Sequence, residues 1–228
     1  FITGNVNWLY VTAGLLLIGT LLALSSLFFI GHFKPIWLIS IFKSFCIVTK
    51  GLWKRYEDGE IDIDEVLTTR FSLTMEKFGV KVSGDQWENM YKENLKNGAQ
   101  MMDGAKEVCE KLSKTHRLVV ATNGVREIQL SRLEKAELVS CCENILDSQS
   151  MGHQKPTKEF FDYIKNNVKD FDIAKTLMIG DSLSSDIKGG NQAGIDTCWL
   201  TKYPQNENFD VKSKYIISDL RELINIVY

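Results

Sequence analysis

The second half of the chain alternates short β-rich runs with amphipathic helical stretches, and this alternation restricts the fold more than any other feature. The β-rich runs are "RLVVATNG", "NILDS", "TLMIGD" and "DTCWL", and the stretches between them include "REIQLSRLEKAEL", "TKEFFDYIKNNV" and "SSDIKGGNQAG". Strand and helix units of this size predict a parallel sheet covered by helices on both faces. We therefore expect an α/β fold with a Rossmann-like, doubly wound parallel sheet.

A small helical module is predicted between residues 61 and 98. Apolar residues recur there at three- and four-residue steps, as in an amphipathic helix; they are Ile63, Val66, Leu67, Phe71 and Met75. Asp62 or Asp64 can cap the start of this helix. A second helix is expected after Ser83, which has Gln86 at capping-box spacing, and it should stop near Gly98. We expect residues 17–98 to form a helical cap, and residues 1–16 and 99–228 to form the core.

Composition and charge exclude several classes of protein. Of the 228 residues, 44% are hydrophobic and 25% are charged, which fits a globular protein. The net charge of −2, with basic and acidic residues interleaved, offers no basic field for a nucleic acid polymer. The five cysteines are odd in number and contain no CxxC pair. This predicts neither a disulfide framework nor a zinc site, and it indicates a reducing, cytoplasmic compartment.

The N-terminal part of the chain differs from the rest in composition. Residues 1–33 contain no Lys, Arg, Asp or Glu, and the first acidic residue is Glu57, where the average frequency would place about seven acids in the first 56 residues. The run from Val11 to Gly31 is long and apolar enough to span a bilayer core of about 30 Å. If this run is genuine, the basic residues that follow it predict a single-pass N-terminal anchor with the remaining chain in the cytoplasm.

Polar residues follow three of the predicted strands. Thr122, Asn123 and Gly124 follow the first strand, Lys155 lies beyond the second, and Asp181 and Asp186 follow the third. Ligands of open α/β sheets bind beyond the carboxyl ends of the strands, so these groups should meet at one rim. A hydroxyl with backbone amides, an ammonium group and two carboxylates can together hold a phosphate and a hard cation such as Mg²⁺.

These residues also carry a family resemblance. In order, spacing and strand context, "ATNG", "HQKP" and "GDSLSSD" resemble motifs II, III and IV of the haloacid dehalogenase superfamily. The text "GLWKRYEDGEIDIDEVLTTRF" and "IKGGNQAGIDTCWL" is similar to the branch of pyrimidine 5′-nucleotidases and related phosphatases. The resemblance covers roughly residues 51–228.

The resemblance implies a Mg²⁺-dependent phosphatase whose cap closes over the site. Thr122 would hold the phosphoryl group, with Asn123 and Gly124 helping to bind phosphate, and Lys155 would neutralise its charge and orient the nucleophile. Asp181 would coordinate Mg²⁺, and Asp186 would support the metal directly or through water. The expected catalytic residues are therefore Thr122, Lys155 and Asp181. The implied substrate is a small phosphomonoester, with a nucleoside 5′-monophosphate as one candidate.

The same residues allow other interpretations. Taken singly, Thr122, Asp181 and Asp186 could cap helices, and Lys155 could be an ordinary solvated lysine, but their joint order favours the site. The letters "GDSL" at Gly180–Leu183 resemble the nucleophile block of the GDSL esterases. In those enzymes the histidine base follows the serine, whereas the histidines of this chain all precede it.

One expected motif is absent. Phosphatases of this superfamily have an N-terminal strand ending in D-x-D-x-T, whose aspartates serve as nucleophile and as general acid and base. By spacing, Tyr10 and Thr12 stand where these aspartates belong. A phenol with a pKa near 10 is a poor nucleophile at neutral pH, and a threonine cannot shuttle a proton as a carboxylate does.

Two explanations of this absence remain open. In one, the first fifty or so residues are a wrong reading of the gene, such as a frameshift restored near Thr49 or Lys50. In the other, the N-terminus is genuine, a core strand and a cap helix are lost, and the chain is a membrane-attached, inactive relative that binds a phosphorylated ligand or a partner. Whether the protein is an enzyme is left undecided. For an active enzyme, Trp53, Tyr56 and Phe71 are candidates for a substrate pocket in the cap, with packing in the cap core as the alternative.

Overall fold

The computed structural model describes residues 35–98, 100–202 and 210–228. These residues belong to two compact units, one made of the helices before Gly98 and one made of the elements after it. No helix among them is long and apolar enough to cross a membrane. The predicted span from Val11 to Gly31, like Tyr10 and Thr12, lies outside the described residues.

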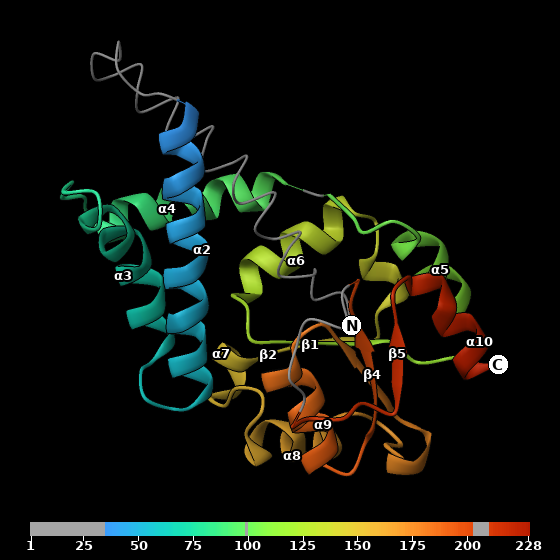
Figure 1. Cartoon of the computed structure of the whole chain (residues 1–228). Coiled ribbons are helices and arrows are strands. Elements are labelled where there is room, and N and C mark those ends of the chain that lie inside the picture. The colour runs from blue at the N-terminus through green and yellow to red at the C-terminus, as the bar shows by residue number, and fades with distance from the viewer. Residues whose placement is uncertain (1–34, 99, 203–209) are drawn as a thin grey trace. The chain divides into compact units, whose positions relative to one another are not determined.

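Three helices form the first unit: α2 (Pro35–Glu57), α3 (Ile63–Glu76) and α4 (Gly84–Asn97) (Figure 1). The predicted caps are confirmed for α3 and α4. The side chain of Asp62 accepts a hydrogen bond from the amide of Glu65 at 2.7 Å, and that of Ser83 accepts one from Gln86 at 3.3 Å. Helix α3 packs against both α2 and α4, and α4 stops at Gly98 as expected.

The core of the helical unit is aromatic and contains one buried ion pair. Phe45, Phe71 and Tyr91 stack around the guanidinium of Arg70, which binds both carboxylate oxygens of Glu88 at 2.7 Å. Phe71 is therefore a core residue, as is the buried Tyr56, against which the half-buried Trp53 packs edge-on. For Phe71 and Tyr56 the structure supports core packing rather than a substrate pocket.

Helix α2 corrects one expectation about the N-terminal part of the chain. A cap helix is not lost before Lys50, because α2 runs unbroken from Pro35 through the supposed junction to Glu57. On the N-terminal side of Thr49, Ile41 and Phe45 are 1% exposed and pack in the same core as residues of α3 and α4. Buried side chains continue from this part at three- and four-residue steps, through Thr49 to Leu52 and Tyr56.

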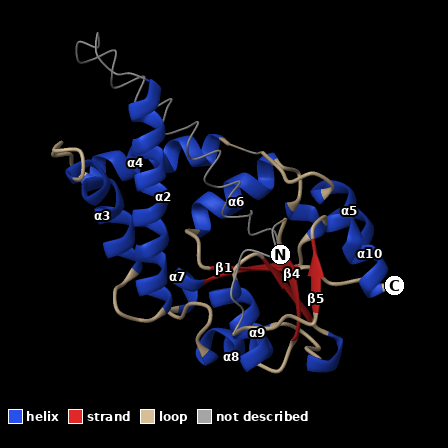
Figure 2. Cartoon of the chain, viewed as in Figure 1, coloured by secondary structure: helices blue, strands red, loops and turns tan. Residues whose placement is uncertain are grey.

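The second unit has the expected alternation of strands and helices (Figure 2). Its elements are α5 (Ala105–Leu112), β1 (Val119–Thr122), α6 (Arg126–Lys135), β2 (Asn144–Asp147), α7 (Ser148–Met151), α8 (Lys158–Asn167), β3 (Leu177–Gly180), α9 (Lys188–Gln192), β4 (Asp196–Leu200), β5 (Tyr215–Ile217) and α10 (Leu223–Val227). Short 3₁₀ turns and a π-helical turn at Leu183–Ile187 connect them. Strand β5 is an element that the sequence analysis did not predict.

All strand pairs in the described chain are parallel, as predicted. Strand β1 pairs with β2, with Thr122 opposite Asp147, while β3 pairs with β4 and β4 with β5. The described strands thus form a two-stranded and a three-stranded sheet rather than one continuous sheet. Both β1 and β3 contribute to an apolar layer against α8, through Val119 and Met178, so the two sheets share one core. The opposite layer consists largely of side chains from α5, β4, β5 and α10.

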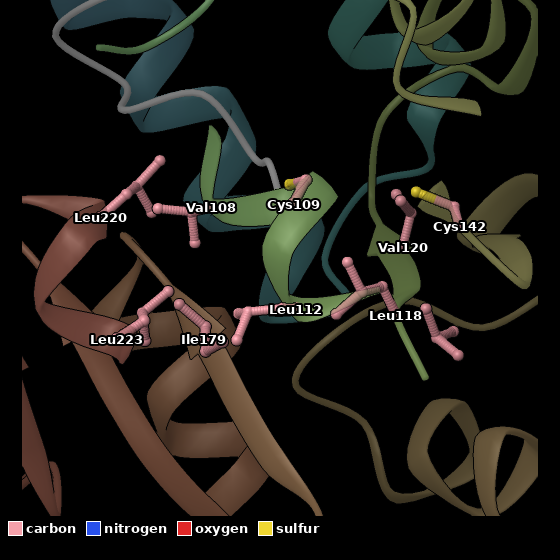
Figure 3. Close-up of a pocket in the computed structure, with 10 residues that line it drawn as sticks. Val108, Cys109, Leu112, Leu118, Val120, Cys142, Ile179, Leu220 and Leu223 are labelled. Carbon is pink, nitrogen blue, oxygen red and sulfur yellow. The ribbon is translucent and has the colours of Figure 1, made fainter. Parts of the chain in front are cut away.

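A small cavity of about 40 Å³ lies beneath α5, beside the beginning of β1 (Figure 3). Leu118 and Val120 line it on one side, Ile179 of β3 on the other, and Val108 and Leu112 of α5 cover it. A cavity of this size can hold one water molecule only if polar groups bind that water, and this lining is apolar. It is therefore a packing void between the two sheets, distinct from the polar rim at the strand ends.

Candidate active site

The end of β1 forms the first part of the site. Thr122 is the last residue of the strand and only 3% exposed. Its hydroxyl oxygen accepts a hydrogen bond from the amide of Gly124 at 2.9 Å, which folds the chain into a tight turn before α6 begins at Arg126. A Cβ on Gly124 would lie 2.5 Å from Nε2 of the Gln129 side chain, which would have to move aside. Among the described residues, the hydroxyl oxygen of Thr122 acts as an acceptor in this contact, so its proton is able to donate to a ligand.

Lys155 and Asp186 form a buried ion pair across the site. Lys155 is 2% exposed, and its Nζ donates to the carbonyl oxygen of Ala121 and to Oδ1 of Asp186, both at 2.7 Å. Asp186 is 1% exposed, and its Oδ2 accepts the amide of Ser182 at 3.1 Å. Lys155 and Asp186 are 31 positions apart in the sequence, and the fold brings their side chains together. Buried charges are stable only when paired and hydrogen-bonded in this way.

Asn123 holds the backbone of Lys155. Its Nδ2 donates to the carbonyl oxygen of Lys155 at 3.0 Å, and its Oδ1 accepts the amide of Lys155 at 2.8 Å. This two-point contact fixes the loop that carries Lys155 to the turn that carries Thr122. The expectation that Asn123 helps to bind phosphate remains a prediction, and its side chain has the additional task of fixing Lys155.

Asp181 follows β3 at the same rim and is partly exposed. Its carbonyl oxygen accepts a hydrogen bond of 3.0 Å from Nε1 of the buried Trp199 on β4, which restrains the backbone at this position. The preceding residue, Gly180, leaves room for Asp186: a Cβ at position 180 would lie 2.2 Å from the Asp186 carboxylate. The order "GD" at the strand end therefore has a steric reason.

Sequence reasoning missed a further carboxylate at this rim. Asp147 ends β2 opposite Thr122 and is 0% exposed. Burial raises the pKa of Asp147, but hydrogen bonds from Arg126 and from Ser150 lower it by more, so the pKa lies below its ordinary value. The available signal was an acidic residue directly after the apolar pair Ile145 and Leu146, at the end of the predicted strand "NILDS". Acidic residues are rarely buried unless their charge is paired.

The acidic groups suit a magnesium ion supported by few protein ligands. In the described part of the chain, no three or more His, Cys, Asp or Glu side chains are grouped to hold a metal. Mg²⁺ commonly uses one or two carboxylates together with waters and substrate phosphate, all of them oxygen ligands. Asp181 is partly exposed and able to act as such a ligand. Asp186 is engaged through both oxygens and is better placed to support the metal indirectly.

The charges at this rim determine what can bind. Lys155, Asp181 and Asp186 together carry one net negative charge, because the ammonium of Lys155 is already matched by Asp186. A phosphate dianion would be repelled by this arrangement unless a divalent cation bound with it. The geometry therefore fits a phosphate group and a cation that enter the site together.

Comparison with known protein families agrees with this geometry. The family described as haloacid dehalogenase-like hydrolase matches residues 41–200, which include parts of both units and every described residue discussed above as part of the site. This chain belongs to that family. The match begins ten residues before Gly51, within α2, so the resemblance extends further toward the N-terminus than its motifs indicated.

Two relatives show how near the resemblance is. HAD-hydrolase YfnB of Bacillus subtilis is 37% identical over 180 residues, which cover 79% of this chain and 77% of YfnB. Pyrimidine 5′-nucleotidase PynA of Streptococcus pneumoniae is 33% identical over 189 residues, which cover 82% and 80% of the two chains.

Solved structures confirm the fold. A crystal structure of YfnB bound to magnesium matches 96% of this chain and 92% of its own chain, with a TM-score of 0.85 and 32% identity. The L-2-haloacid dehalogenase of Xanthobacter autotrophicus matches with a TM-score of 0.74 at 12% identity, which shows the fold alone. The predicted Rossmann-like α/β core is thereby confirmed.

Proposed function

We propose that this chain binds a small phosphomonoester together with Mg²⁺ and hydrolyses it, with pyrimidine nucleoside 5′-monophosphates as the preferred substrates. The observation that carries the proposal is the buried ion pair of Lys155 and Asp186 beside Thr122 and Asp181. Together these four residues carry one net negative charge, so we expect a phosphate dianion to bind with a divalent cation. We infer the pyrimidine preference from the similarity to PynA and to pyrimidine 5′-nucleotidase YjjG of Escherichia coli, which is 28% identical over 182 residues.

The described residues would divide the work as follows. Thr122 would donate its hydroxyl proton to a phosphoryl oxygen, and the amides of the turn at Asn123 and Gly124 would bind the same group. The ammonium of Lys155 has three N–H groups, and among the described residues it donates to two acceptor atoms, the carbonyl oxygen of Ala121 and Oδ1 of Asp186. One N–H is therefore left for the phosphate. Asp181 would hold Mg²⁺, which when bound supplies the positive charge that a developing phosphate charge requires.

The helical unit would act as a cap that excludes water, in a chain whose core spans residues 1–16 and 99–228 and whose cap spans residues 17–98. The cap would contribute the contacts that distinguish one phosphoester from another. We place the protein in the cytoplasm, where phosphorylated metabolites and free thiols coexist.

A second candidate function is ligand binding without turnover. It is favoured by one observation: residues 1–56 contain no Asp or Glu, so no carboxylate from that part of the chain can serve as the nucleophile. Thr122, Lys155 and Asp181 would in that case still bind a phosphorylated ligand.

Hydrolysis of p-nitrophenyl phosphate with and without Mg²⁺ separates the two functions. The phosphatase should lose activity on removal of the metal with EDTA, and Asp181→Ala should abolish it. Glu134→Ala, which removes an exposed carboxylate on α6, is the matched control and should remain fully active. Phosphate binding that depends on Mg²⁺, with no turnover of p-nitrophenyl phosphate, UMP or AMP, would instead establish the binding function. Faster turnover of AMP than of UMP would refute the pyrimidine preference.

A further inference from the structure

Asp147 is a fully buried carboxylate that the proposed function does not use. It lies at the end of β2, opposite Thr122, at the rim where the proposed phosphate site begins. Burying a carboxylate costs several kcal/mol unless charge and hydrogen bonds compensate it. A charge at this place therefore needs a reason beyond packing, for which Val or Ile would serve in a strand.

The two oxygens of Asp147 are bound by two different loops. Oδ2 accepts Nη1 of Arg126 at 2.9 Å, and Oδ1 accepts the amide of Ser150 at 2.8 Å. The same Nη1 of Arg126 donates to the carbonyl oxygen of Ile145 at 2.8 Å. Arg126 thus bridges the start of α6 and the end of β2, while Ser150 ties α7 to the same carboxylate.

Both loops lead directly to residues of the proposed site. Arg126 is the first residue of α6 and follows Gly124 by two positions, so holding its side chain also holds the turn that carries Thr122. Ser150 belongs to α7, after which the chain passes through Gly152 to Lys155. At the end of β2, the carboxylate of Asp147 therefore connects the segment that carries Thr122 with the segment that leads to Lys155.

We propose that Asp147 and Arg126 are positioning residues that hold the Thr122 turn and the Lys155 loop in register, and that they thereby set the affinity for phosphate. The choice of phosphate as the ligand rests on the proposed function, whereas the positioning of the two loops does not depend on it. Neither side chain needs to touch the phosphate. Their effect passes through the backbone of the two loops.

The two members of the pair should respond differently to substitution. The side chain of Arg126 is 49% exposed, so after Asp147→Asn the guanidinium can turn to solvent. The asparagine oxygen can still accept the amide of Ser150, and the contact with Arg126 is lost because two N–H donors then face each other. After Arg126→Ala the carboxylate of Asp147 remains buried without its cation, which is the more damaging state.

The same two strands provide a matched control at their opposite ends. Arg117 and Glu143 lie just before β1 and β2 and form an ion pair, with Nε and Oε2 2.7 Å apart and both side chains 41% exposed. Arg117→Ala removes an arginine–carboxylate pair between these strands without touching the rim. Arg126→Lys serves as a milder second variant, because a lysine keeps the charge but carries it on a compact ammonium instead of the planar guanidinium whose Nη1 binds Asp147 and Ile145.

The experiment combines two measurements on the full chain. Hydrogen–deuterium exchange of peptides covering 122–126 and 148–157 reports on the loops without any ligand, and titration calorimetry with inorganic phosphate and Mg²⁺ reports on the site. We expect Asp147→Asn and Arg126→Lys to speed exchange in both peptides and to weaken phosphate binding at least fivefold, while Arg117→Ala changes neither.

The outcomes separate the two proposals. Unchanged exchange in both loops of the Asp147→Asn and Arg126→Lys proteins would overturn the positioning role, whatever the phosphate affinity. An equal loss of affinity in Arg117→Ala would also overturn it, because general destabilisation would then explain the result. A wild-type chain that binds no phosphate would refute the proposed function, and the exchange data would still decide whether Asp147 positions the two loops.

Discussion

A single methyl group added at position 180 should disrupt the site. In Gly180→Ala the new Cβ would lie 2.2 Å from Oδ2 and 2.3 Å from Cγ of Asp186, far inside van der Waals contact. Asp186 cannot move aside easily, because it is 1% exposed and is held by Nζ of Lys155 at 2.7 Å and by the amide of Ser182 at 3.1 Å. Either β3 shifts or the ion pair opens.

The expected cost follows from these two possibilities. Overpacking a well-filled site costs about 1–3 kcal/mol when the backbone can adjust. Opening the pair leaves Lys155 buried without its carboxylate, and breaking a buried pair costs about 3–5 kcal/mol. We expect Gly180→Ala to lower the free energy of unfolding by about 3 kcal/mol, a large share of the about 5–15 kcal/mol of a typical domain. Phosphate binding should be lost as well.

Urea denaturation followed by circular dichroism measures the stability of this variant. Gly51→Ala is the control, because Gly51 lies inside α2, is exposed and has no atom within 4 Å of the position of its Cβ. That substitution should stabilise the protein by up to about 1 kcal/mol, since alanine favours helix over glycine. A loss below about 1 kcal/mol in Gly180→Ala, with phosphate binding intact, would refute the inference that Asp186 is rigidly held.

Three further results are expected. Glu88→Ala should destabilise the helical unit by about 3–5 kcal/mol in urea melts because it leaves Arg70 buried and unpaired, whereas the double change Arg70→Met and Glu88→Leu should cost much less. The pKa of Asp147 in the folded state lies below the unfolded value of about 3.9, so its stabilising contribution is complete above that pH and is lost as the pH falls through the folded pKa. The difference in urea midpoint between wild type and Asp147→Asn should therefore narrow in acid. Burial raises the pKa of Cys198 to about 12, so mass spectrometry after maleimide treatment at pH 7.5 should find this thiol unmodified in the folded protein.

The helices and strands that were predicted correctly depend on residues that lie close together in the sequence. The apolar periods and cap residues of α3 and α4 lie within a few residues of each other, and the structure confirms both caps, at Asp62 and Ser83. Strand β4 was expected at "DTCWL" and spans Asp196–Leu200. Strand β5 was missed because it has three residues, only one of them fully buried, so neither length nor alternation marks it.

The parts that were missed depend on distant partners. The first half of helix α2 is mostly apolar and follows a long apolar run, so its buried face was not evident from the sequence. The burial of Ile41 and Phe45 in one core with Phe71 shows which face packs against α3 and α4. The residue types at the rim predicted a site for a phosphate and a cation, but not the hydrogen bonds that position these residues. The side-chain amide of Asn123 forms two hydrogen bonds with the backbone of Lys155, which lies 32 residues further along the chain. No spacing rule predicts that these two loops meet.

The side chain of Lys155 has a consequence for how this protein folds. It leaves a loop after α7, reaches the carbonyl oxygen of Ala121 in β1, and binds Asp186 in the segment after β3. One ammonium group therefore bridges segments that belong to the two different sheets. The candidate site cannot be complete in a state where only one sheet has formed, because Lys155 would then lack either Ala121 or Asp186 as a partner. Recovery of phosphate binding during refolding should thus report the docking of the two sheets, later than the helix signal of the same chain.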